Sequence, residues 1–156
     1  MKGKLTPARL MAAMAVACLS IPSGAQALDQ KIGQHWRCVA SDGGSDIEYA
    51  IGHLETVGDA LGKGVPAEKV RLAHLHVWEA HEFGVGREVA HMPMQANRVA
   101  CAGQIYIGEG MEIPDSFATA YATWAAEAEA GRAQWFLAPV DVMFKATREI
   151  IRKDAP

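Results

Sequence analysis

The chain has 156 residues, 50% of them hydrophobic and 21% charged, and its formal net charge at pH 7 is −3. This length fits one domain with a hydrophobic core of its own. The mildly acidic balance argues against a nucleic-acid-binding protein, because such surfaces need clustered lysine and arginine.

Residues 1–27 have the pattern of a cleaved secretory signal peptide. Three basic residues precede an apolar stretch, Leu10–Ile21, which is too short to cross a bilayer. An Ala-x-Ala sequence then predicts cleavage after Ala27, which leaves a mature domain of residues 28–156. The alternative is a lipoprotein signal with the lipid attached to Cys18.

Removal of this segment changes the properties of the mature chain. The segment carries three positive charges and no acid, so the net charge changes from −3 to −6. No other apolar run is long enough to cross a membrane, so we expect no membrane span in the mature chain. The signal peptide predicts a periplasmic or secreted location.

Two cysteines remain after export, Cys38 and Cys101. In an oxidising compartment an even pair most often forms a disulfide, and this is the predicted state. A pair of metal-binding thiolates and a redox-active dithiol are the alternatives, although the chain has no Cys-x-x-Cys sequence.

The middle of the chain has spacings typical of helices. Ser45–Glu48 matches a capping box, and apolar residues follow at intervals of four, three and seven, which predicts a helix over residues 45–61. His53 is expected at the border of this helix with solvent. Pro66 fits the first turn of a second helix that ends before Gly84.

Three further elements are expected in the rest of the chain. Pro93 begins a predicted third helix that runs to about Ile107, although Gln104–Ile107 could instead form a short strand. A fourth helix is predicted over residues 115–130, and Pro139 begins a last amphipathic helix. The predicted fold is therefore all-α, a single compact domain of four or five helices with one disulfide.

Histidine and methionine are concentrated between Val65 and Met94. Imidazole suits zinc and copper, and thioethers suit Cu(I). If the segment is helical, His74 and His81 share one face, whereas His76 lies off it. His91, Met92 and Met94 follow in the next turn. The candidate ligands for a copper or zinc ion are His74, His81, His91 and Met94.

No sequence motif of high specificity indicates catalysis. The chain has no Gly-x-Ser-x-Gly sequence and no unpaired reactive cysteine once the disulfide forms. The preferred hypothesis is a non-enzymatic exported protein that binds a protein partner and needs no cofactor. The alternative hypothesis is the His/Met metal-binding protein.

Two short segments resemble a known family. Cys101–Gly108 reads Cys-Ala-Gly-Gln-Ile-Tyr-Ile-Gly, and Phe136–Val140 leads into the terminal helix. This pattern resembles the periplasmic immunity proteins of type VI secretion amidase toxins, the Tai/Rap family. The resemblance implies a small secreted helical protein, forming a homodimer, that blocks a toxin acting on peptidoglycan. The cysteine that the family has before Pro139 is absent here.

Overall fold

The computed structural model describes residues 29–41, 43–57, 70–83, 88–101 and 103–154, with the side chains of 151–154 excepted. The predicted signal peptide and the alternative lipidation site at Cys18 lie outside the described residues. No helix among the described residues is long and apolar enough to cross a membrane.

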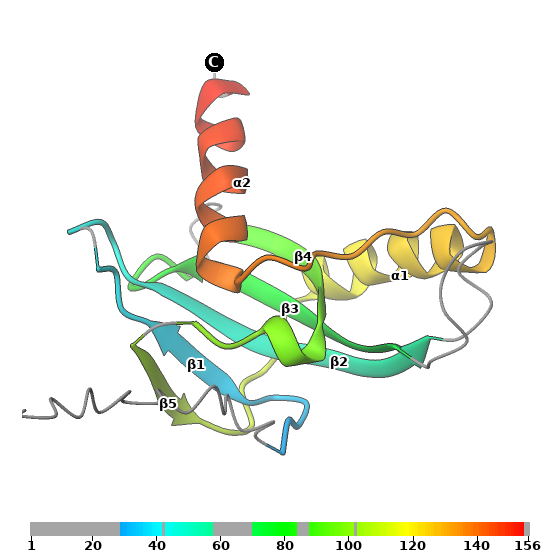
Figure 1. Cartoon of the computed structure of the whole chain (residues 1–156), viewed down its shortest axis with the longest axis horizontal. Helices are drawn as coiled ribbons and strands as arrows, with labels where there is room; N and C mark the ends of the chain where they lie inside the picture. Colours follow the sequence, from blue (N-terminus) through cyan, green and yellow to red (C-terminus); the bar gives the residue numbers. More distant parts are fainter. Residues whose placement is uncertain (1–28, 42, 58–69, 84–87, 102, 155–156) are drawn as a thin grey trace, which may run out of the picture.

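A five-stranded antiparallel sheet forms the centre of the protein, and two helices follow it in the chain (Figure 1). The order of strands across the sheet is β4-β3-β2-β1-β5, so the first four strands form a meander and the fifth returns to pair with β1. The elements are β1 (His35–Cys38), β2 (Ile47–Val57), β3 (Val70–Glu79), β4 (Glu88–Gln95), a 3₁₀ turn η2 (Ala96–Arg98), β5 (Gln104–Gly108), α1 (Asp115–Glu129) and α2 (Val140–Asp154).

The predicted all-α fold is therefore wrong, and the errors lie in the first three predicted helices. Residues 47–57 of the first form β2, and residues 70–79 of the second form β3. The third is divided among the end of β4, η2 and β5. Apolar residues four apart share a face in a strand as well as in a helix, so this spacing does not separate the two. The β-branched and aromatic residues of these segments favour strands.

For the later elements, the predictions from the sequence agree better with the structure. The alternative of a short strand at Gln104–Ile107 is confirmed by β5. The predicted helix over residues 115–130 is confirmed by α1, which begins at Asp115, and α2 begins directly after Pro139. These two helices contain alanine and other good helix formers and few β-branched residues at their centres, so their propensity agrees with the observed structure.

The helix α2 lies against the apolar face of the sheet. Val140 and Phe144 are fully buried there, in one cluster with residues from β1 to β4. Arg148, one turn further along the same side of the helix, forms an ion pair with Glu79 at the end of β3. Beyond this buried side, α2 projects away from the body of the protein (Figure 1).

The helix α1 covers the opposite face at one end of the long strands. Phe117 of α1 is buried over Gly52 of β2. A Cβ atom built on Gly52 would lie 2.4 Å from the Phe117 ring, which is too close for any side chain. The glycine therefore sets how closely α1 approaches the sheet.

The predicted disulfide between Cys38 and Cys101 is present in the structure. It joins the end of β1 to the loop that precedes β5, across a sequence separation of 63 residues. A disulfide of this kind is compatible with a protein exported to an oxidising compartment.

Reduction of this disulfide should lower the stability of the protein. Closing a loop of this length removes chain entropy from the unfolded state, which corresponds to at most about 4 kcal/mol of stabilisation. We expect the urea midpoint to fall when dithiothreitol is added, and the double variant Cys38→Ser/Cys101→Ser to show no further change with the reductant. Two free thiols in freshly purified oxidised protein would contradict the assignment.

Candidate functional site

Strand β3 buries polar side chains on one face and apolar side chains on the other. Leu75 and Val77 face the core beneath α2, whereas His74, His76 and Trp78 point to the α1 side of the sheet. All five side chains are almost completely buried. A buried imidazole must find hydrogen-bond partners, so the α1 face requires a set of polar neighbours.

Two register shifts supply those neighbours. In β2, Ile51 lies opposite Leu75 but His53 lies opposite His74, so Gly52 is an extra residue. Side chains alternate along a strand, and a regular register would therefore turn His53 to the core beneath α2. The bulge places His53, and Glu55 two residues later, on the same face as His74.

The second shift acts on β4. Met92 lies opposite Leu75 and Val89 lies opposite Val77, so two residues of β4 oppose the single residue between them on β3. The shift brings Val89 to the core face and Glu88 to the α1 face, where Glu88 reaches His76. His91 precedes the core-facing Met92, so alternation along the strand places it on the α1 face. β2, β3 and β4 each present a histidine to this face.

His74 has both ring nitrogens close to another polar group. Its Nδ1 lies 2.8 Å from Nε2 of His91, and the two rings are nearly parallel. Its Nε2 lies 2.7 Å from Oε1 of Glu55. That oxygen is not in line with the ring N–H direction, so Nε2 is close to a carboxylate but has no hydrogen-bond partner. The short distance between the two atoms suggests a hydrogen bond, whereas their alignment does not permit one. The distance gives the proximity of the two atoms, whereas the alignment excludes an ordinary hydrogen bond.

Aromatic rings of α1 close this group of residues from above. The Trp124 ring lies 4.6 Å from the His74 ring, and Tyr121 lies 4.7 Å from the His53 ring, measured between centroids. The hydroxyl of Tyr121 also donates to Oε1 of Glu55 at 3.3 Å. We call His53, Glu55, His74 and His91 the histidine row.

The environment of His74 and His91 favours neutral imidazole. Burial, followed by the neighbouring His91 and His53, lowers the pKa of His74 to about 3. Burial also lowers the pKa of His91 to about 4. At neutral pH both rings are uncharged. Only one of the two facing nitrogens, His74 Nδ1 or His91 Nε2, then carries a proton, which it donates to the other.

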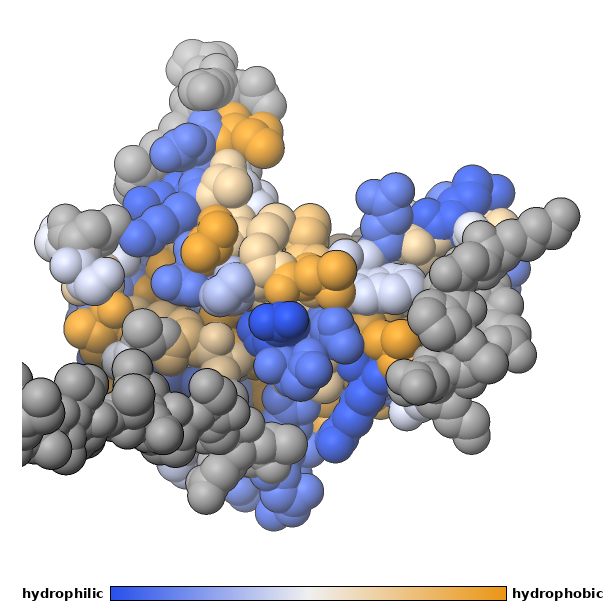
Figure 2. All heavy atoms as spheres, in the orientation of Figure 1, coloured by the Kyte–Doolittle hydropathy of each residue, from blue (hydrophilic) through white to orange (hydrophobic). Residues whose placement is uncertain are grey.

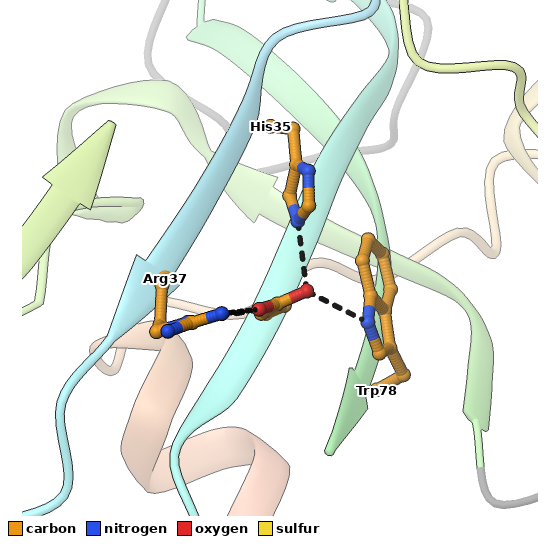
Figure 3. Close-up of polar contacts among 4 residues, drawn as sticks. His35, Arg37 and Trp78 are labelled. Carbon is orange, nitrogen blue, oxygen red and sulfur yellow. Dashed lines mark hydrogen bonds and ion pairs between the residues drawn. The ribbon is translucent and has the colours of Figure 1, made fainter. Parts of the chain in front are cut away.

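A second polar group lies further along the same face, around Glu48. Arg37 donates two hydrogen bonds to Oε1, at 2.8 and 2.6 Å, while Trp78 Nε1 donates to Oε2 at 3.1 Å. His35 Nε2 lies 3.0 Å from the same Oε2 atom, and Figure 3 shows the three side chains converging on the carboxylate. Burial acts to raise the pKa of Glu48, but the hydrogen bonds from Arg37 and His35 outweigh it and hold the pKa below its ordinary value.

The structure brings together two of the four predicted metal ligands. His74 and His91 are in contact, as described above. His81 lies in the turn after β3, exposed and with a positive φ of 69°. Met94 is fully buried in the core beneath α2, on the opposite face of the sheet. His74, His81, His91 and Met94 therefore do not form one site.

Sequence analysis missed His53 and Glu55. A helix over residues 45–61 places them near solvent, whereas the strand and its bulge bring them to His74. An isolated glycine in a strand pattern is a recognised indication of a bulge, and Gly52 precedes His53 directly. No three side chains of His, Cys, Asp or Glu among the described residues converge closely enough to hold a metal ion in this conformation.

No known protein family, curated protein or solved structure matches this chain. Function must therefore be inferred from the residues themselves.

Removal of the Glu48 carboxylate should destabilise the protein strongly. Glu48→Ala leaves Arg37 charged and Trp78 without its acceptor, in a site where the Glu48 side chain is only 9% exposed. Loss of one partner from a buried ion pair costs about 3 kcal/mol. Urea denaturation checks this, with Glu127→Ala as the matched control, because Glu127 forms a similar pair with Arg132 at the exposed surface. Equal effects of the two substitutions would contradict the role of Glu48.

Acid should weaken the metal-free protein through His74 and His91. Histidine in an unfolded chain titrates near pH 6.5, well above both folded values, so the unfolded state binds more protons as the pH falls from about 6.5 to 4. Stability is therefore present above this window and is lost on acidification through it. Urea titrations from pH 7 to 4.5 in EDTA should show a shallower decline for His91→Gln than for wild type. His81→Gln is the control, and an equal decline in wild type and His91→Gln would refute the explanation.

Proposed function

We propose that this protein is exported to the periplasm and acts by binding a protein partner. The observation that supports this proposal is an exposed apolar surface formed by α2 and the segment before it. Its large side chains are Phe136, Leu137, Val142 and Ile150, which are 37%, 59%, 51% and 61% exposed. In Figure 2 the hydrophobic colour gathers over this part of the protein.

The shape of α2 adds to this support. One stripe of the helix, Val140 and Phe144, already packs against the sheet, so Val142 and Ile150 are not needed for the core. Contiguous apolar surface of this kind is more typical of an interaction site than of ordinary solvent-exposed helix. An open hollow lined by Ala133, Gln134, Trp135 and Leu137 lies beside it and could receive a side chain of the partner.

Immunity against a cell-wall amidase toxin is the specific form of this proposal. It rests on the resemblance of Cys101–Gly108 and Phe136–Val140 to the immunity family. Phe136 and Leu137, in the second of these segments, belong to the exposed apolar surface. The helical fold that the resemblance implies is not the fold of this chain. A homodimer through α2 is a further form of protein binding that the same surface allows.

Site-specific photo-crosslinking in the periplasm tests the proposal. A photoreactive residue at position 150 should give one stoichiometric crosslinked partner, whereas the same residue at the exposed Glu129 of α1 should give none. The crosslinked species identifies an amidase, another protein or a second copy of this chain. Purified protein should also inhibit a captured amidase on peptidoglycan, and Ile150→Asp should reduce that inhibition at least tenfold. No crosslink at 150, or equal crosslinks at both positions, would contradict the proposal.

A further inference from the structure

We propose that two copies of this chain associate through the outer edge of β5, so that their sheets join into one continuous antiparallel sheet. β5 is the last strand on its side of the sheet and pairs only with β1 (Figure 1). This surface is separate from the one formed by α2. The inference therefore does not depend on the proposed function.

The outer edge of β5 has backbone groups without partners. Neighbouring residues in a strand direct their N–H and C=O groups to opposite edges, so every second residue of β5 presents both groups away from β1. Among the described residues, no backbone hydrogen bond reaches this edge from another segment. A row of free donors and acceptors of this kind is a template on which a further strand can pair.

The opposite edge of the sheet is closed. There the backbone N–H of Phe136 donates to the carbonyl of Pro93 in β4 at 2.8 Å, and the N–H of Gln95 donates to the carbonyl of Phe136 at 3.1 Å. Pro93 itself has no N–H to offer. Prolines, charged side chains and covering segments are the usual protection of a sheet edge. β5 reads Gln-Ile-Tyr-Ile-Gly and has no proline and no charge, so its edge is open to a partner strand.

Exposed apolar side chains gather at the open edge. Ile105, Tyr106 and Ile107, the three central residues of β5, are 47%, 46% and 43% exposed. The exposed Val39, which follows β1, lies beside Gly103 at the start of β5. A partner strand would cover this apolar surface at the same time as it pairs with the backbone.

The sequence of β5 is suited to pairing with itself. The residues around Tyr106 read Ile-Tyr-Ile in both directions. A two-fold axis at Tyr106 therefore places Ile105 of each copy opposite Ile107 of the other, and the two Tyr106 residues opposite each other. Tyr106 already lies opposite Trp36 of β1, with ring centroids 4.8 Å apart, so four aromatic rings would form one row across the junction. Cross-strand aromatic and β-branched pairs stabilise antiparallel sheets.

The charges near this edge are compatible with a second copy. Glu109 follows β5 directly, and in the two-fold arrangement the two Glu109 residues lie at opposite ends of the paired strands. They are separated by six residue positions, or about 20 Å along the strand. This distance exceeds the Debye length of about 8 Å at physiological ionic strength, so the repulsion between them is screened. Arg37, opposite Ile105 on β1, is already paired with Glu48.

Sedimentation equilibrium of the purified mature chain tests the proposal. The strand is short, and contacts smaller than about 800 Å² per partner are typically transient, so we expect a monomer–dimer equilibrium in the micromolar range. Tyr106→Lys and Tyr106→Glu should each weaken the dimer at least tenfold, because the axis places two like charges directly opposite each other. An equimolar mixture of the two variants should recover the dimer, because the charges are then opposite.

Phe83 provides the matched control. It is 45% exposed and lies in the loop after β3, so Phe83→Lys and Phe83→Glu introduce the same charges at a similarly exposed aromatic residue away from β5. Both should dimerise as the wild type does, and circular dichroism verifies the folding of every variant. A wild-type chain that stays monomeric at millimolar concentration would overturn the proposal. So would a mixture of the Tyr106 variants that fails to dimerise, or a dimer that Ile150→Asp abolishes and Tyr106→Lys does not.

Hydrogen exchange of the unaltered protein keeps the test decisive if the Tyr106 variants fail to fold. As the chain concentration rises from micromolar to millimolar, the amides of alternate residues in β5 should become more protected. The amide of Gln95, which is bonded within the monomer, should show no such change. Protection of β5 that is independent of concentration, or that arises only when another periplasmic protein is added, would contradict the proposed self-association.

Discussion

Strand β3 sets the organisation of this protein, because it is buried on both faces and only one of them is apolar. Leu75 and Val77 complete the core beneath α2, while His74, His76 and Trp78 are buried on the other side. Burial of unpaired polar groups is costly, so each of the polar side chains demands a partner from the neighbouring strands. Glu48 meets this demand for Trp78 and Glu88 meets it for His76. His91 meets it for one ring nitrogen of His74, whose other nitrogen contacts Glu55 without a hydrogen bond.

The two bulges are the means by which the neighbouring strands supply these partners. Without the extra residue at Gly52, His53 and Glu55 would turn toward the apolar core, and without the shift in β4, Glu88 would turn away from His76. Gly52 also allows Phe117 of α1 to close over the face. One glycine therefore connects the register of the sheet, the position of α1 and the composition of the candidate site.

Parts of this structure could be predicted from the sequence and others could not. The disulfide follows from the cysteine count, and the two C-terminal helices follow from their helix-forming residues. Strand β2 was predicted as a helix because Ile47 and Ile51 are four residues apart, a spacing that both structures place on one face. His74 and His91 were recognised as candidates, but their partners depend on bulges that no periodic pattern encodes. A helical interpretation of the segment places Met94 near the histidines, whereas strand alternation sends it to the core.

The exposed apolar surface of α2 and the histidine row lie on opposite faces of the sheet. The helix α2 presents apolar residues outward from one face of the sheet, whereas α1 covers the histidine row on the other. The disulfide holds β1 and the loop before β5 together without contributing a residue to either. A partner could therefore dock on α2 without contacting the histidine row.

The protonation of His74 and His91 most directly tests the central claim that these two rings pack against each other in the neutral form. Long-range ¹H–¹⁵N NMR of histidine-labelled protein at pH 6 in EDTA reports the proton on each ring nitrogen. The account predicts that both rings are neutral, with His74 Nδ1 and His91 Nε2 sharing one proton. Two rings that exchange freely with solvent and titrate near pH 6.5 would contradict it, because they could not be buried together beneath α1.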